Sequence, residues 1–243
     1  MKKIKIIILA VAAIALVACG NNAAQKAAQK AAEAAALKAA QDSIAAAELA
    51  AKAQIISEKI KMLAEEPVFV IKTSLGTIKV KLYKKTPLHR ANFEKLALEG
   101  YYDGLLFHRV INGFMIQGGD PLTKDPAKVD LYGTGGPSYT IPAEFVKEYK
   151  HKKGALAAAR RGDAANPMKE SSGSQFYLVQ SPEACAQLDG DYTVYGQTIE
   201  GLDVIDKIAS VQTNRRGLPA NPVKIISITL DPAFEPVPEA PAE

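Results

Sequence analysis

The 243-residue chain has no tryptophan, only two cysteines and only three histidines. The histidines, at positions 89, 108 and 151, are scattered without partners at ligand spacing, which argues against a metal site. No Gly-x-Ser-x-Gly or cysteine–histidine arrangement supports acyl transfer. The sequence therefore offers no evident metal centre or activated nucleophile, and its function has to be sought in other residue types.

A strong excess of one charge is also missing. The formal net charge is +4, but Lys2, Lys3 and Lys5 lie in the first eighteen residues, which contain no acid. Without that segment, 27 basic side chains face 26 acidic ones. Because phosphate binding needs a basic stripe, the composition argues against a nucleic-acid partner.

The N-terminus is typical of an export signal. Lysines precede an apolar run of thirteen residues, 6–18, which is shorter than the roughly 20 residues of a membrane-spanning helix. Leu16-Val17-Ala18-Cys19 matches the bacterial lipobox, so we expect a signal peptide over 1–18 and a lipidated Cys19 that anchors the protein to a membrane. Gly20 favours the outer membrane or periplasm. The alternative interpretation is a short anchor that stays uncleaved.

Cysteine usage is consistent with this interpretation. If Cys19 carries lipid, Cys185 has no partner for an internal disulfide. We interpret Cys185 as a small packing residue, because no neighbouring histidine or basic cluster favours a reactive thiolate.

Alanine dominates the segment that follows, a predicted spacer over 19–65. Residues 23–64 contain no glycine or proline, and their alanine, glutamine, lysine and glutamate favour helix. Such a helix would extend roughly 60 Å. Apolar residues recur every seven positions in two sets whose registers differ, Leu37/Ile44 and Leu49/Ile56/Leu63. We expect a monomeric spacer helix, with weak association through a coiled-coil seam as the alternative.

Residues 66–231 alternate short apolar segments with turns that carry glycine or proline. Ile78, Val80 and Leu82 alternate with polar residues, the pattern of a strand with one buried face. We expect strands at 68–73, 77–83, 106–111, 114–118, 155–159, 175–180, 193–198 and 223–230, and helices at 87–99 and 202–209. This set predicts a mainly β fold, a closed eight-stranded antiparallel barrel capped by two α-helices, because closure removes exposed edges. The proline-rich tail, 232–243, should be extended and disordered.

The most informative run is 107–120, Phe-His-Arg-Val-Ile-Asn-Gly-Phe-Met-Ile-Gln-Gly-Gly-Asp. Apolar neighbours place the guanidinium of Arg109 beside an apolar surface. A guanidinium offers five donors and has no proton to lose at neutral pH. It therefore suits a task that needs a fixed donor beside an apolar pocket. Taken alone, such an arginine is more often an ordinary surface or ion-pair residue.

This run resembles the central signature of the cyclophilins, the peptidyl-prolyl cis-trans isomerases. Residues 172–178, Ser-Gly-Ser-Gln-Phe-Tyr-Leu, resemble their second signature, and 188–196, Leu-Asp-Gly-Asp-Tyr-Thr-Val-Tyr-Gly, their third. The blocks stand in the family's order, and the resemblance covers roughly 66–231. It implies the cyclophilin barrel, isomerisation of X-Pro bonds without a cofactor, and proline-containing polypeptides as partners.

The resemblance also implies a role for each site residue. Arg109 would donate a hydrogen bond to the prolyl nitrogen, which regains a lone pair as the amide twists. Gln117 and Phe114 complete the catalytic group, and Gln175 would position Arg109. Phe114, Met115, Tyr177 and Leu188 would surround the proline ring of the substrate. Ala159 and Arg160 would hold the substrate residue before that proline. The other substrate-binding candidates are Tyr192, Gln175 and His108. Strand alternation, however, sends His108 to the face opposite Arg109 and favours a structural role.

Several positions depart from the family pattern. Gln187 stands where a tryptophan is common, Tyr192 where histidine is, and Arg160 where asparagine is, and the segment 160–173 is longer. We expect activity to persist with altered ligand preference and weak cyclosporin binding. The predicted function is thus a lipid-anchored isomerase that assists the folding of envelope proteins. The alternatives are a catalytically slow proline-peptide binding or chaperone module, and a structural spacer in which the alanine-rich helix is the active part.

Overall fold

The structure is a computed structural model that describes residues 23–234. The chain forms two compact units, Met1–Ile55 and Ile56–Glu243. The predicted signal peptide, the predicted lipidation site Cys19 and residues 235–243 of the predicted tail lie outside the described residues. Within 23–234, no helix combines the length and apolar character needed to cross a bilayer.

The alanine-rich segment forms one α-helix, α2, Ala23–Lys61. Its 39 residues extend about 58 Å at the rise of an α-helix. The predicted helix is therefore confirmed. Leu37, Ile44 and Leu49 are 61%, 52% and 70% exposed, so the apolar residues of the possible seam are open to solvent. Association of two such helices stays a prediction.

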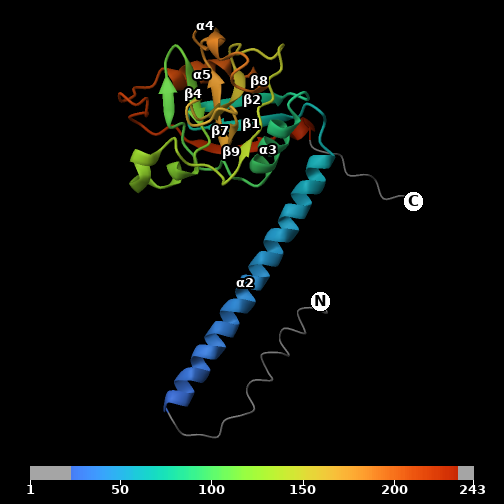
Figure 1. Ribbon diagram of the computed structural model, residues 1–243, viewed down its shortest axis with the longest axis vertical. Coiled ribbons are helices and arrows are strands. Elements are labelled where there is room, and N and C mark those ends of the chain that lie inside the picture. Colours follow the sequence, from blue (N-terminus) through green and yellow to red (C-terminus); the bar gives the residue numbers. More distant parts are fainter. Residues whose placement is uncertain (1–22, 235–243) are drawn as a thin grey trace, which may run out of the picture. The chain divides into compact units, whose positions relative to one another are not determined.

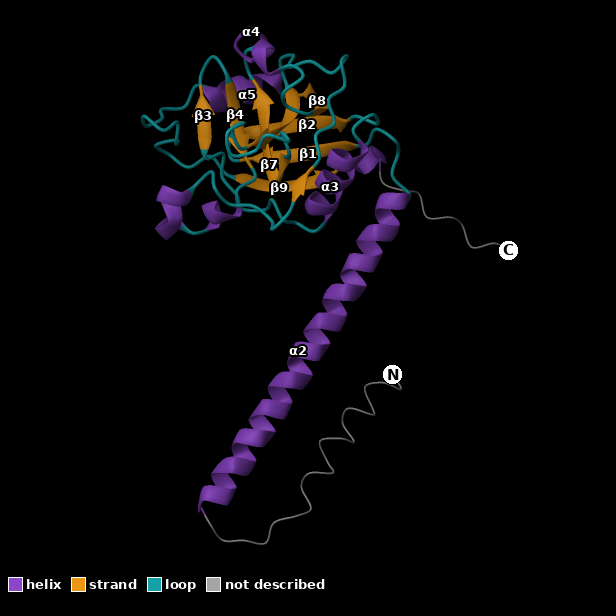
Figure 2. Cartoon of the chain, viewed as in Figure 1, coloured by secondary structure: helices purple, strands orange, loops and turns teal. Residues whose placement is uncertain are grey.

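The other described residues are built around one antiparallel sheet of nine strands, drawn in orange in Figure 2. The strands are β1 Val68–Thr73, β2 Gly76–Leu82, β3 Arg109–Ile111, β4 Met115–Gly118, β5 Thr140–Ile141, β6 Ala155–Arg160, β7 Ser171–Val179, β8 Val194–Glu200 and β9 Ile225–Leu230. Their order is β3-β4-β7-β6-β8-β2-β1-β9, and β5 pairs with β7. The neighbouring strands β2, β1 and β9 can be followed in Figure 1. The mainly β fold is confirmed.

The prediction of a closed barrel is wrong, because the sheet stays open between β3 and β9. The predicted strands 106–111 and 223–230 shorten to β3 and β9, and irregular segments run between these edges. The N–H of Phe107 donates to the carbonyl of Val223 at 2.9 Å, and a single bridge joins Leu106 to Lys224. These scattered bonds cover the seam without a regular ladder, so the sheet is a curled half-barrel.

The two predicted helices are present as α3 Pro87–Leu98 and α5 Leu202–Ala209, and both bury apolar residues in the main core. Leu202, expected on the apolar side of α5, is instead exposed. The four-residue helix α4, Pro182–Cys185, was not predicted. Short 3₁₀ helices occupy Pro121–Lys124, Pro126–Leu131, Ala186–Leu188 and Pro232–Phe234. The last of these shows that the predicted extended tail begins with a helical turn.

Neighbouring strands send alternate side chains into two separate cores, and this division positions the site. Ile116 of β4 and Leu178 of β7 belong to the main cluster inside the half-barrel. Met115 and Tyr177, one residue earlier in each strand, belong to a smaller cluster that also contains Cys185. Burial raises the pKa of Cys185 to about 11, which agrees with its prediction as a packing residue.

Candidate active site

Arg109 begins β3 and pairs with Gln117 of β4, and this register brings the two side chains together. Nη1 of Arg109 donates to Oε1 of Gln117 at 3.2 Å and lies 3.9 Å from the sulfur of Met115. The guanidinium carbon is 5.9 Å from the centre of the Phe114 ring. Within the described part of the chain, Arg109 forms no ion pair with a carboxylate. Its positive charge is therefore held by neutral groups and remains available to a ligand.

Two glutamines extend this contact into a polar chain. Nε2 of Gln117 donates to Oε1 of Gln175 at 2.9 Å, and Nε2 of Gln175 donates to the carbonyls of Gly133 and Gly135 at 3.0 and 2.7 Å. A backbone carbonyl can only accept and a guanidinium can only donate. The direction of each amide is therefore fixed from both ends, and Gln175 orients Arg109 through Gln117.

The loop that supplies these carbonyls is held by Asp120, which is fully buried. One carboxylate oxygen accepts from the N–H of Leu122 at 2.7 Å. The other accepts from the N–H groups of Gly133 and Gly135. Asp120 ends the run 107–120, so the motif that contains Arg109 also fixes the loop that orients it.

A small cluster of apolar side chains adjoins the guanidinium. Met115, Tyr177, Phe114, Leu188, Tyr192 and Ala159 all belong to or pack against the smaller cluster. Tyr177 and Tyr192 meet edge to face, with their ring centres 6.2 Å apart. The structure thus brings together the residues predicted to surround the proline ring.

Arg160 is turned away from solvent at the end of β6. Its side chain is 4% exposed, and its guanidinium carbon lies 4.3 Å from the centre of the Tyr192 ring. Its Nε donates to the carbonyl of Asp191 at 2.8 Å. The β6–β7 register shifts between Ala158 and Arg160, so the ladder skips Ala159, which has no partner on β7. Arg160 therefore supports Tyr192 from behind.

His108 is 5% exposed, and burial lowers the pKa of its imidazole. β3 begins at Arg109, one residue after His108. His108 and Arg109 both border a hollow of about 230 Å³, together with Tyr132 and Arg216. Burial alternates along this stretch, since His108 and Val110 are buried and Arg109 is half-buried, and the placement of His108 on the face opposite Arg109 stays a prediction.

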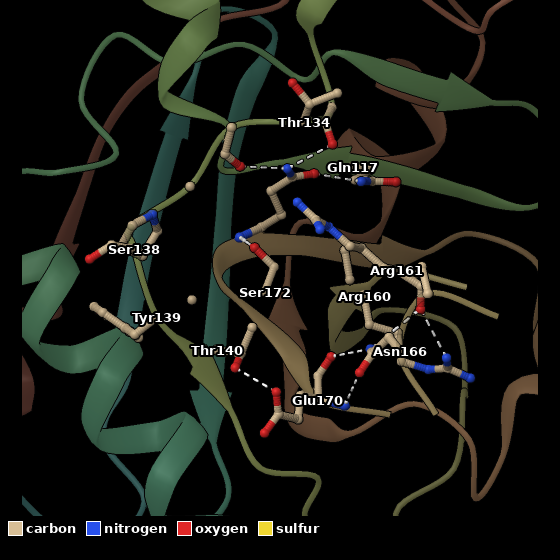
Figure 3. Close-up of a pocket in the computed structure, with 18 residues that line it drawn as sticks. Gln117, Thr134, Ser138, Tyr139, Thr140, Arg160, Arg161, Asn166, Glu170 and Ser172 are labelled. Carbon is tan, nitrogen blue, oxygen red and sulfur yellow. Dashed lines mark hydrogen bonds between the residues drawn. The ribbon is translucent and has the colours of Figure 1, made fainter. Parts of the chain in front are cut away.

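A larger pocket of about 760 Å³ adjoins the site and shares Gln117, Gln175, Ala159 and Arg160 with it. Figure 3 shows Arg160 and Arg161 on one side of this pocket and Ser138 and Tyr139 on the other. Asn166 and Glu170 of the lengthened segment also line it. Sequence reasoning missed this pocket, since its walls come from segments far apart in the chain.

Sequence reasoning also missed the role of His151, which was interpreted only as a scattered histidine. His151 is buried, and its ring nitrogens contact Tyr177 and Asp189. Asp189 lies in the third motif, but its partner 38 residues earlier carries no sequence signal.

A cationic donor beside a cluster of apolar side chains, on a curled antiparallel half-barrel, is an arrangement suited to a prolyl isomerase. Residues 68–230 match the family model described as cyclophilin type peptidyl-prolyl cis-trans isomerase. The chain belongs to this family and is an isomerase.

Relatives and solved structures agree with this assignment. A Helicobacter pylori peptidyl-prolyl cis-trans isomerase is 42% identical over 156 residues, covering 62% of this chain and 85% of the relative. An Acinetobacter baylyi isomerase is 38% identical, covering 66% and 83%. A Cryptosporidium parvum cyclophilin type isomerase of known structure matches with a TM-score of 0.60 and 29% identity, covering 68% of this chain and 98% of that one.

Proposed function

We propose that this isomerase acts on X-Pro bonds in extended segments of exported envelope proteins and so assists their folding, with Arg109 as the group that stabilises the twisted amide. Rotation about such a bond meets a barrier of about 18–20 kcal/mol because amide resonance is lost. The prolyl nitrogen becomes pyramidal and gains a lone pair only in the transition state. A donor aimed at that nitrogen therefore binds the transition state better than the ground state.

The observation that carries this proposal is the setting of Arg109. Its guanidinium has neutral partners, a fixed orientation and a cluster of apolar side chains beside it. The apolar cluster takes the proline ring, and Ala159, which has no partner on β7, receives the preceding residue as an added strand. The larger pocket offers room for a further side chain of the same peptide. A Cryptosporidium parvum relative was crystallised in the presence of the dipeptide Ala-Pro, which supports this substrate class.

The test is the rate of cis-to-trans exchange of a short Ala-Pro peptide. Arg109→Ala should lower kcat/KM about 100-fold, the loss typical of removing one transition-state donor. Arg215→Ala is the matched control, because it removes an exposed arginine outside the site and should leave the rate unchanged. Equal rates for wild type and Arg109→Ala would remove Arg109 from the mechanism.

A second candidate is a proline-peptide binding module that turns over slowly. The altered rim favours it, since Gln187 is exposed and donates to the nearby carbonyl of Ala184. Tight binding of a proline peptide without accelerated exchange would support this candidate over the enzyme. Exchange that is accelerated at saturating peptide would exclude it.

We also propose that the protein is tethered to the cell envelope through lipid on Cys19, with α2 as the spacer. The support is the lipobox sequence and the length of the helix that follows it. Cys19→Ser should move the protein from the membrane fraction to the soluble fraction of cells. A Cys19→Ser protein that stays with the membrane would contradict the lipid anchor.

A further inference from the structure

One chain of hydrogen bonds beside the smaller apolar cluster has no part in the function proposed above. Tyr177, a member of that cluster and a proposed wall of the proline site, is 4% exposed and places its hydroxyl 2.8 Å from Nε2 of His151. Nδ1 of His151 lies 2.7 Å from Oδ1 of Asp189, and the backbone N–H of His151 donates to the same oxygen at 2.9 Å. His151 is 3% exposed. His151 therefore links Tyr177 to Asp189, in the turn that follows Leu188 of the same cluster.

The two ends of this chain determine where its protons lie. Burial acts to raise the pKa of Asp189, but hydrogen bonds from His151 and Lys150 hold that pKa below its ordinary value, so the carboxylate accepts from Nδ1. Burial raises the pKa of Tyr177 far above its ordinary value, so the phenol keeps its proton. Nε2 of neutral His151 then accepts the hydrogen bond that the Tyr177 hydroxyl donates.

Charged and titratable groups surround the chain on several elements. Asp189 and Lys150 face His151, and their effects on its charge oppose each other. Tyr177 is faced by Cys185 of α4, by Tyr192 and by Arg160 of β6, in addition to Asp189. Burial lowers the pKa of His151 despite the bond to Asp189, so the neutral form prevails at neutral pH.

We propose that His151 is a positioning residue of the isomerase: it fixes the Tyr177 wall of the proline site by accepting its hydroxyl proton, and acid withdraws that acceptor and weakens substrate binding. The inference rests on the proposed function. A protonated Nε2 faces the phenol oxygen as a donor, so the phenol proton must turn away. Neither the apolar side chains around Tyr177 nor a bound proline ring offers an acceptor for this proton. The unsatisfied hydroxyl therefore disfavours the position of the Tyr177 ring that holds the proline. Arg109 is oriented separately, through Gln117 and Gln175.

The experiment measures KM and kcat for the Ala-Pro peptide from about pH 7.5 down to about pH 4, because burial lowers the pKa of His151 below the ordinary histidine value. Wild type should show KM rising about fivefold in acid, the effect of one neutral hydrogen bond, with kcat little changed. His151→Gln should abolish this rise, because its amide accepts at every pH. His89→Gln, which changes a buried histidine bonded to Glu144 and not to this chain of hydrogen bonds, should retain it. A rise that persists in His151→Gln, or a wild type without one, overturns the proposal.

Two further measurements do not depend on His151→Gln folding. Tyr177→Phe removes the hydroxyl and should also abolish the acid rise in KM. In the full wild-type chain, NMR signals of the Tyr177 ring should shift with the same midpoint as the imidazole signals of His151. Tyr177 signals that stay constant through that titration overturn the proposal. A wild type that does not accelerate exchange would instead refute the proposed function, and the NMR titration would still decide the role of His151.

Discussion

Glu94 of α3 gives a prediction about stability that can be worked out from its surroundings. Its side chain is 3% exposed, and Oε1 lies 3.4 Å from Nε of Arg90. Burial raises the pKa of Glu94 from 4.5 to about 7, although Arg90 partly opposes the change. Because each pH unit corresponds to 1.36 kcal/mol, ionising this carboxyl costs the folded state roughly 3 kcal/mol.

Because the pKa of Glu94 is raised in the folded state, this carboxyl makes the protein less stable as the pH rises. A carboxyl with a raised folded-state pKa contributes its full stability below pH 4.5 and loses it as the pH rises through about 7. Glu94→Gln cannot ionise. The variant should match wild type near pH 4.5 and exceed its free energy of unfolding by roughly 3 kcal/mol above about pH 8.

The assay is urea unfolding of wild type and variant over this pH range, compared at each pH so that other titrations cancel. Glu48→Gln is the matched control, because it makes the same change at an exposed position on α2. Its free energy of unfolding should change with pH in parallel with that of wild type. Parallel curves for Glu94→Gln as well would refute the argument that burial of Glu94 opposes its ionisation.

Three further predictions concern the supports of the site. Asp120→Ala leaves three loop N–H groups without their acceptor and should cost about 3 kcal/mol or more in urea unfolding. It should also slow exchange, since the loop orients Arg109, the proposed donor. Arg160→Ala removes the cation beneath Tyr192 and should raise KM severalfold with little change in kcat, measured by peptide exchange. Gly119→Ala should destabilise the fold by about 3 kcal/mol in thermal unfolding, because φ is +90° and the new Cβ would lie 2.3 Å from the Ser174 carbonyl oxygen.

The elements that could be predicted from the sequence are those with strong local periodicity. The alternating residues of β2 predicted a strand at 77–83, within one residue of the observed Gly76–Leu82, and the apolar stripe of α5 predicted its bounds, 202–209. The two-residue strand β5 is too short to show a period. The open seam depends on irregular backbone bonds between distant segments, and no local pattern signals such bonds.

The candidate site likewise has contacts that the sequence predicts and contacts that it does not. Arg109 and Gln117 lie eight residues apart in one motif, and the strand pair brings them together as the pattern indicates. The contacts that support them cross long stretches of chain, as His151 does to reach Tyr177. Long-range contacts of this kind depend on how strands pair and loops return, which a single sequence does not state.

The path from the glycine carbonyls through two glutamines to Arg109 has an evolutionary consequence. The orientation of the Arg109 guanidinium depends on a surface loop as well as on the strand that bears Arg109. Insertions or exchanges in that loop could therefore retune turnover while every residue in contact with substrate stays the same. Natural selection would then have a route for adapting the catalyst to new clients at little risk to the core of the fold.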